Sequence, residues 1–287
     1  MKINLIYWNA PNYGDALSPR LVEELTGGVV QFKDITLSRG KRMKALLTGD
    51  RPIIRTILFP HQEVYGVIGS ILSWMPKRAK VWGAGFMNEH DSFAGGDVYA
   101  VRGKLTEQKL IDLGGNACGI YGDPALLLPL WLEGSSEKST EIALIPHWKE
   151  VDYFKDKYGD NYAIIDFRSK DVERITSEIA ACRYILSSSL HGLIVAHAYG
   201  IPALWIKHGY IDTDGFKFHD YFSSVDIPLY NGFSNIDEIL SDVTHWRQLF
   251  EEHSSCSKIN RSLKELQTDL LKAAPFALQA KYKNYAV

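Results

Sequence analysis

Residues 184–207 read YILSSSLHGLIVAHAYGIPALWIK, the pattern of a strand, a serine-rich turn, an apolar helix closed by Gly200, and a second strand. This order predicts a parallel βαβ unit, the building block of α/β sheets. In open α/β sheets, ligands bind beside the carboxyl ends of the strands. We therefore expect residues 187–191 and the strand end at Lys207 to lie at a ligand-binding edge.

Length and composition indicate a protein with a sizeable folded core. The chain has 287 residues, of which 46% are hydrophobic and 23% charged, as is ordinary for a globular protein. This length favours two domains over one. The formal net charge of -2 argues against a nucleic-acid partner, because such proteins neutralise many phosphates with clustered Lys and Arg. The three cysteines lack metal-binding spacing, and we expect reduced thiols.

The amino terminus and the apolar runs bear on the location of the protein. Residues 1–8 enter directly into a strand-like run without the pattern of a secretion signal. No run in the sequence approaches the roughly 20 apolar residues of a membrane-spanning helix. We therefore expect a cytoplasmic protein. The most basic segment, 38–55, fits either a solvated face or peripheral contact with anionic lipids at the inner face of the membrane.

The first half of the chain repeats one pattern, a short apolar strand followed by glycines or polar residues. A helix is expected after the first strand, with Ser18 as its N-cap and Gly27 as its end. Glycines directly after strands let either a ligand or a packed helix approach the backbone closely, and both roles stay open here. The candidate ligand-binding residues in these turns are Asn12, Gly14, Asp15, Gly69, Ser70, Gly83 and Gly85.

The second half has the same organisation. Strands are expected over 141–145 and 162–166, ending near His147 and Arg168.

The remaining expectations concern the end of the chain. Residues 208–224 are expected to form a polar and aromatic loop, and 225–229 a short strand. From 258 to about 285, leucines on one side and lysines on the others predict a helix that packs onto the body of the protein.

Six short motifs occur in order between about Asn12 and Lys207. They are residues 12–15, 66–72, 81–86, 101–103, 122–125 and 188–196. Together they resemble the polysaccharide pyruvyl transferase family. Many members carry an arginine two residues before the motif histidine, where this chain has Ser189.

The resemblance implies an α/β fold with two Rossmann-like domains facing each other across a cleft, as in GT-B glycosyltransferases. A linker at 129–140 places an N-terminal, acceptor-side domain at 1–130 and a C-terminal, donor-side domain with the C-terminal helix at 131–287. The resemblance also implies transfer of pyruvate from phosphoenolpyruvate to two hydroxyls of a sugar. The product is a cyclic ketal in a capsule, exopolysaccharide or cell-wall polymer.

This chemistry sets the expected partners. Phosphoenolpyruvate is the donor substrate, and neither a cofactor nor a metal is expected. The acceptor is a sugar, and whether it is linked to a lipid stays open.

Phosphoenolpyruvate carries a phosphate and a carboxylate, so its site needs several hydrogen-bond donors. Arg102 and Lys207, at strand ends of the two halves, would supply positive charge from opposite walls. Arg102 would otherwise cap local structure. Ser188 and Ser189, at the start of the apolar helix, would add hydroxyls and backbone N–H groups where the helix dipole favours an anion.

His191 is the candidate to donate the proton or to stabilise the departing phosphate, because histidine changes protonation near neutral pH; the alternative is a structural histidine at the start of the helix. A helix N-terminus disfavours imidazolium, so the protonated form would depend on a bound anion. His147 and Arg168 are secondary candidates for contacts with donor or sugar. Asp15 and Asp123 would orient sugar hydroxyls, act as the base, or serve as turn and cap residues.

Two other functions stay open at this point. A nucleotide-sugar glycosyltransferase shares the two-domain plan and would need an acidic residue for a ribose, for which Asp212, Asp214 and Asp220 are weak candidates. A non-catalytic sugar-binding or scaffold protein of a polysaccharide assembly complex would need no proton donor at position 191.

Overall fold

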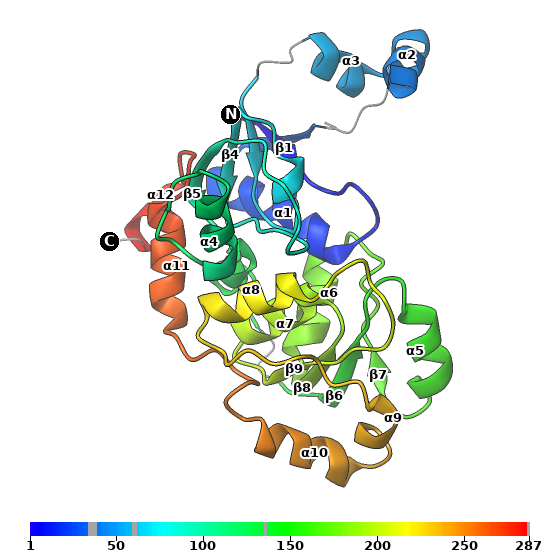
Figure 1. Ribbon diagram of the computed structural model, residues 1–287. Helices are drawn as coiled ribbons and strands as arrows, with labels where there is room; N and C mark the ends of the chain where they lie inside the picture. Colours follow the sequence, from blue (N-terminus) through cyan, green and yellow to red (C-terminus); the bar gives the residue numbers. More distant parts are fainter. Residues whose placement is uncertain (34–38, 59–61, 135–136, 286–287) are drawn as a thin grey trace.

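The structure is a computed structural model that describes residues 1–33, 39–58, 62–134 and 137–285 (Figure 1). Within these residues, two parallel sheets, one in each half of the chain, form the framework. The predicted α/β class is therefore confirmed.

The sheet of the first half has the order β2-β1-β3-β4-β5, and every pairing is parallel. In the second strand of this order, Leu5 pairs with Phe32 on one side and with Tyr65 on the other. The strands are β1 (Lys2–Ile6), β2 (Val29–Phe32), β3 (Val64–Gly66), β4 (Ala79–Trp82) and β5 (Asp97–Ala100). Their carboxyl ends lie at one edge because all run in the same direction.

The sheet of the second half has the order β7-β6-β8-β9 and is also parallel. Its strands are β6 (Thr140–Ile145), β7 (Ala163–Ile164), β8 (Cys182–Ser187) and β9 (Ala203–Trp205). The helix α7 (Leu190–Ala198) connects β8 to β9, so the predicted βαβ unit is confirmed. Gly200 follows the helix with a φ of 68°, a left-handed conformation that favours glycine.

The first helix, α1 (Tyr13–Thr26), begins six residues earlier than the sequence predicts. Asn12 is its N-cap, and the Asn12 side chain accepts a hydrogen bond from the Asp15 N–H at 3.3 Å. Ser18 instead lies buried in the helix, where its hydroxyl accepts a bond from the Ile68 N–H. The predicted end at Gly27 is confirmed.

The remaining helices connect and cover the sheets. They are α2 (Arg39–Thr48), α3 (Arg51–Leu58), α4 (Lys104–Asp112), α5 (Val151–Tyr158), α6 (Val172–Ala180), α8 (Phe216–Ser224), α9 (Ile236–Ile239), α10 (Val243–Glu252), α11 (Leu263–Lys272) and α12 (Ala280–Tyr285), with the 3-10 helices η1 (Leu72–Trp74) and η2 (Pro124–Leu130). Figure 1 shows α2 and α3 projecting away from the first sheet.

Three expectations near the end of the chain are wrong. The expected loop 208–224 contains the helix α8, and the described segment 225–229 forms no strand. The expected long helix is divided into α11 and α12, with Pro275 in the break, where its missing N–H and its ring oppose a continuous helix.

The last two helices pack against the first half of the chain. The Trp82 indole N–H donates to the Leu270 carbonyl at 2.9 Å, and the Gln279 N–H donates to the Leu25 carbonyl at 2.8 Å. The chain therefore returns to its first half after completing the second sheet. The domain boundary between residues 130 and 131 stays a prediction.

Candidate functional site

A pocket of about 420 Å³ opens between the two halves of the chain. From the first half it is lined by the segments that follow β1, β3 and β4, and from the second by the turns after β6 and β8 and by the start of α8. The polar lining residues are Asn12, Asp15, Ser70, Ser73, Asn88, Asp91, His147, Ser189, His191, Asp212 and Lys217.

His191, the second residue of α7, lies in this pocket with its side chain 14% exposed. Its Nε2 lies 3.8 Å from Oδ2 of the fully buried Asp123, and neither atom has a hydrogen-bond partner among the described residues. A Cβ at position 14 would lie 2.2 Å from the imidazole Nδ1, so Gly14 leaves the space that the ring occupies. The first turn of α1 therefore packs closely against the histidine of the other half.

Burial and the nearby cations keep the pocket histidines neutral. Burial, Arg102 and Lys217 lower the pKa of His191 to about 3. Burial, Lys217 and Lys149 lower the pKa of His147 to about 3. A bound anion would oppose the effect of the cations and raise both pKa values.

Lys217 is the pocket cation that the sequence analysis missed. Its side chain is 6% exposed, and it lies near the start of α8. Burial and Arg102 lower its pKa to about 8, so the ammonium is still the main form at neutral pH. Across the same pocket, burial raises the pKa of Asp15 to about 7, against the opposing effect of Lys217.

The sequence contains a pattern that predicts the helix α8, but no pattern that predicts where this helix packs. Phe218, Tyr221, Phe222 and Val225 have helical spacing and are all buried. This pattern indicates an amphipathic helix. Its recognition would have assigned Lys217 to a helix and not to the expected loop. Only the packing of α8 across both halves shows that its first turn reaches the pocket.

Arg102 follows β5, as expected, but its side chain is fully buried behind the pocket wall. Its Nε donates to Asp220 at 2.9 Å, Nη1 donates to the Ser70 hydroxyl at 2.6 Å, and Nη2 donates to the Phe86 carbonyl. Asp220 also accepts bonds from the N–H and hydroxyl of Thr106, both at 2.7 Å. The Arg102 guanidinium thus fixes α8 and the Ser70 turn, and it is not a surface group of the pocket.

Six other predicted residues do line the pocket. They are Asn12, Asp15, Gly69, Ser70, His147 and Ser189. The structure thus brings together, around His191, turns that are more than 170 residues apart in the sequence.

The structure does not bring Lys207 and Arg168 to this pocket. Lys207 continues the sheet through a bond from its N–H to Phe233, and its ammonium lies 5.5 Å from the centre of the Trp205 ring. Arg168 is held by Asp166 and Asp152, with nitrogen–oxygen distances of 2.9 and 2.8 Å.

Three further predicted residues do not line the pocket and make structural contacts instead. The Ser188 hydroxyl accepts a bond from the His147 N–H at 2.8 Å and donates to Glu150. Gly83, with a φ of 88°, packs against Pro124, and Gly85 leaves room for Arg102. At both glycines, the group that closely approaches the backbone is therefore another part of the protein and not a ligand.

Tryptophans at the mouth of the pocket are a second feature that the sequence analysis missed. Trp8 and Trp74 come from the first half and Trp148 from the second. The Trp8 and Trp148 rings lie 5.5 Å apart between centroids. Trp8 lies two residues after the end of β1 and Trp148 three residues after the end of β6, in the segments where ligand-facing residues of parallel sheets occur.

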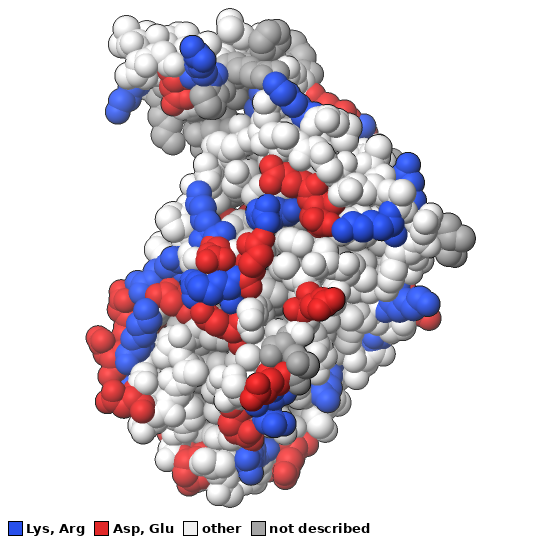
Figure 2. Space-filling model, turned by 180° about the vertical axis from the view of Figure 1, so that it is seen from behind, with Lys and Arg blue, Asp and Glu red and all other residues white. Residues whose placement is uncertain are grey.

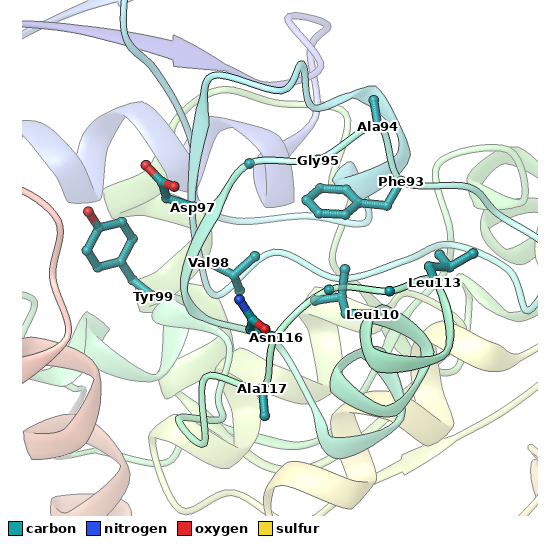
Figure 3. A pocket seen from close by; sticks show the side chains of 13 residues that line it. Phe93, Ala94, Gly95, Asp97, Val98, Tyr99, Leu110, Leu113, Asn116 and Ala117 are labelled. Carbon is teal, nitrogen blue, oxygen red and sulfur yellow. The ribbon is translucent and has the colours of Figure 1, made fainter.

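A different pocket, of about 510 Å³, lies beside β5 and the end of α4 (Figure 3). Phe93, Val98 and Leu110 contribute to its lining, and Asp97 is the one charged residue among those described there. It contains none of the predicted site residues. We therefore take the pocket around His191 as the candidate active site.

The protein is thus an α/β protein with two parallel sheets, and its candidate ligand pocket lies between the two halves. Residues 12–210 match the family described as polysaccharide pyruvyl transferase. The match covers more than half of the chain, and the chain belongs to this family. Family membership supports a transferase that acts on polysaccharide.

Individual proteins are also similar to the chain. An uncharacterised protein of Acanthamoeba polyphaga mimivirus is 30% identical over 174 residues, which are 57% of this chain and 60% of that protein. The E. coli heptosyltransferase WaaC with ADP-2-deoxy-2-fluoro heptose aligns over 88% of this chain and 99% of its own, with 10% identity and a TM-score of 0.38. The E. coli ADP-heptose LPS heptosyltransferase II aligns over 89% and 98%, with 14% identity and a TM-score of 0.32.

Proposed function

We propose that the protein transfers pyruvate from phosphoenolpyruvate to two hydroxyls of a sugar, forming a cyclic ketal and releasing phosphate. The observation that carries this proposal is the placement of Lys217, His191 and the start of α7 in one pocket. A cation and a helix N-terminus suit an anionic donor, and a histidine in the same pocket supports the assignment of a proton donor.

The donor's charges would meet Lys217 and the first turn of α7. The amides of Leu190 and His191 lie in that first turn, where N–H groups have no acceptor within the helix. The Ser189 side chain makes no capping bond to the helix, which leaves its hydroxyl for a ligand. These groups would bind the phosphate and the carboxylate together.

His191 would deliver the proton once the donor is bound. The donor's negative charge raises the pKa of the imidazole, which then protonates the methylene carbon as a sugar hydroxyl adds to the neighbouring carbon. The C–O bond to phosphate then breaks, and the second hydroxyl adds to the same carbon to close the ketal, with its proton passing to the released phosphate. Asp15, with its pKa raised to about 7 by burial, is suited to accept a hydroxyl proton near neutral pH.

The geometry gives less support to a nucleotide-sugar glycosyltransferase. Asp220 is occupied by Arg102 and Thr106. Asp214 accepts bonds from the N–H groups of Glu89 and Phe216, at 2.8 and 2.9 Å. These two carboxylates are thus engaged within the protein, and the third candidate, Asp212, lines the pocket but is paired with Lys149.

The direct test is incubation with phosphoenolpyruvate and a panel of sugar acceptors. We expect release of phosphate and formation of an acid-labile ketal. Absence of both across a broad panel would contradict the proposal. A thermal shift with a nucleotide sugar but not with phosphoenolpyruvate would instead favour the glycosyltransferase.

Lys217 and Lys207 provide a matched comparison. We expect Lys217→Met to raise the KM for phosphoenolpyruvate by about 10- to 100-fold, since hydrogen bonds to charged groups contribute about 1.5–3 kcal/mol. Burial of the ammonium costs free energy, so the variant should not unfold more easily. Lys207→Met should stay within about twofold of the wild type, and steady-state kinetics with thermal melts would measure both. Equal KM values for the two variants would remove Lys217 from the donor site.

We also propose that α2 and α3 contact anionic lipid near the acceptor. Among the described residues no helix is long and apolar enough to span a membrane. The two helices project from the body (Figure 1) and expose Leu47 at 82%, Met43 at 63% and Leu58 at 64%. Arg42 and Lys44 are exposed on the same segment. Elsewhere, Figure 2 shows basic and acidic side chains interspersed over one face.

Vesicle sedimentation of the full chain would test this contact. Each basic residue near an anionic surface contributes about 1 kcal/mol, so Arg42→Ala with Lys44→Ala should weaken binding to phosphatidylglycerol vesicles by roughly 30-fold. The control is Lys258→Ala with Lys264→Ala, an exposed pair outside α2 and α3, at and just before the start of α11. Equal losses in both double variants, or no binding by the wild type, would exclude a specific contact.

A further inference from the structure

We propose that the mouth of the pocket, formed by Trp8, Trp74 and Trp148, is a subsite for an uncharged pyranose ring. Its role as the acceptor subsite rests on the proposed function, whereas binding of the sugar itself does not.

The exposure of these tryptophans is the first observation. All seven tryptophans of the chain lie in described residues, and the two that are exposed, Trp8 at 38% and Trp74 at 37%, both line this pocket. Large aromatic side chains dominate the buried cores of proteins. An indole left open at a concave site therefore has an apolar face available for a ligand.

The arrangement of the rings is the second observation. Trp8 and Trp148 come from opposite halves, with centroids 5.5 Å apart and ring planes inclined at 47°. The Lys149 ammonium lies 5.5 Å from the centre of the Trp148 ring and pairs with Asp212. The inclined rings form an angular wall, which suits the C–H face of a sugar ring better than a flat heteroaromatic group.

The polar groups beside the rings suit hydroxyls. Oδ2 of Asp91 accepts bonds from the Met87 and Asn88 N–H groups at 2.9 and 3.1 Å, which fixes the carboxylate at the pocket. Asp212 has a φ of 63°, a left-handed conformation uncommon outside glycine. Carboxylate and amide groups are the usual partners of sugar hydroxyls, because they accept or donate several hydrogen bonds.

The charges of the residues that line the pocket disfavour the binding of an anionic sugar at the mouth. Among the described residues that line the pocket, Lys217 is the one lysine or arginine, and the proposed donor uses it. Asp15 and Asp91 line the same pocket, and Asp212, which also lines it, pairs with Lys149 beside the Trp148 ring, so this ammonium is already engaged. A phosphorylated or carboxylated ring at the mouth would thus meet carboxylates without a free cation. A phosphate carried by the acceptor must lie outside the pocket.

The experiment is saturation-transfer NMR on the full-length wild-type protein. The probes are methyl β-galactopyranoside, methyl α-mannopyranoside and N-acetylmannosamine, with glucose 6-phosphate as the anionic comparison. We expect saturation of the ring protons of at least one neutral sugar and weaker binding of the phosphate. Trp8→Ala and Trp148→Ala should each weaken sugar binding by about tenfold, and Trp148→Phe should retain most of it.

The control is Tyr210→Ala, which removes an aromatic ring that is 78% exposed outside this pocket and should change nothing. Thermal shifts with phosphoenolpyruvate should be unchanged in the tryptophan variants, which also shows that they fold. Sugar binding that is absent in the wild type, or equal in wild type and tryptophan variants, would overturn the subsite even if phosphoenolpyruvate is turned over. Tryptophan-dependent sugar binding without reaction of phosphoenolpyruvate would keep the subsite and reject the proposed function.

Discussion

His191→Gln is expected to lower kcat for ketal formation by about 10²- to 10⁴-fold, the usual contribution of a general acid. Glutamine occupies similar space against Gly14 and keeps a hydrogen-bonding group, but it cannot deliver a proton. Binding of phosphoenolpyruvate should persist, because Lys217 and the start of α7 stay in place. Phosphate release with excess acceptor measures the first effect, and a thermal shift measures the second.

His245→Gln is the matched control, since this histidine is exposed on α10 and pairs only with nearby residues of that helix end. A kcat of His191→Gln within threefold of the wild type would leave the imidazole without a role in the chemistry. It would also favour the non-catalytic sugar-binding alternative if the wild type is equally slow.

The protonation of His191 gives an independent measurement of the same step. Its pKa is lowered to about 3 in the free protein by burial and two cations, so the ring is neutral at pH 7. Phosphoenolpyruvate places negative charge beside those cations, and the pKa should rise. A histidine-detected NMR titration that shows the same pKa with and without phosphoenolpyruvate would exclude His191 as the proton donor.

The framework could be predicted from the sequence because its signals are local. The stretch from Tyr184 to Lys207 contains a strand, a helix and a strand of recognisable composition, and the buried strands of a parallel sheet read as short apolar runs. The carboxyl ends of those strands follow from their direction. Asn12, Ser70, His147 and Ser189 therefore reach one pocket, as expected of residues at strand ends.

The charged parts of the site depend on contacts that no local pattern contains. Arg102 and Asp220 are separated by 118 residues. Their pairing makes Arg102 a buried structural residue, and it fixes α8 in its position across both halves. The same crossing brings Lys217 into the pocket, while Lys207 at the strand end continues the sheet. The sequence predicts a pocket cation just after β9, at Lys207. The packing of α8 places a different cation, Lys217, in the pocket.

The buried pair of Arg102 and Asp220 gives the second large expected effect. Both side chains are fully buried, and removing one partner of such a pair leaves an uncompensated charge that costs about 3–5 kcal/mol. We expect Arg102→Met to lower the free energy of unfolding by this amount, measured by denaturant titration. Arg102→Met with Asp220→Leu should recover part of the loss, because an apolar pair of similar size leaves no buried charge.

Lys104→Met is the control that distinguishes the loss of the buried ion pair from a general weakening of the contacts between the two halves. Lys104 also pairs across them, with Asp226 at 2.7 Å, but both side chains are nearly half exposed, and exposed pairs contribute little. Equal stabilities of the Lys104 and Arg102 variants would contradict a structural role for the buried pair. If Arg102→Met keeps its stability but loses phosphoenolpyruvate binding, the guanidinium contacts the donor directly, and the pocket must open further when the donor binds.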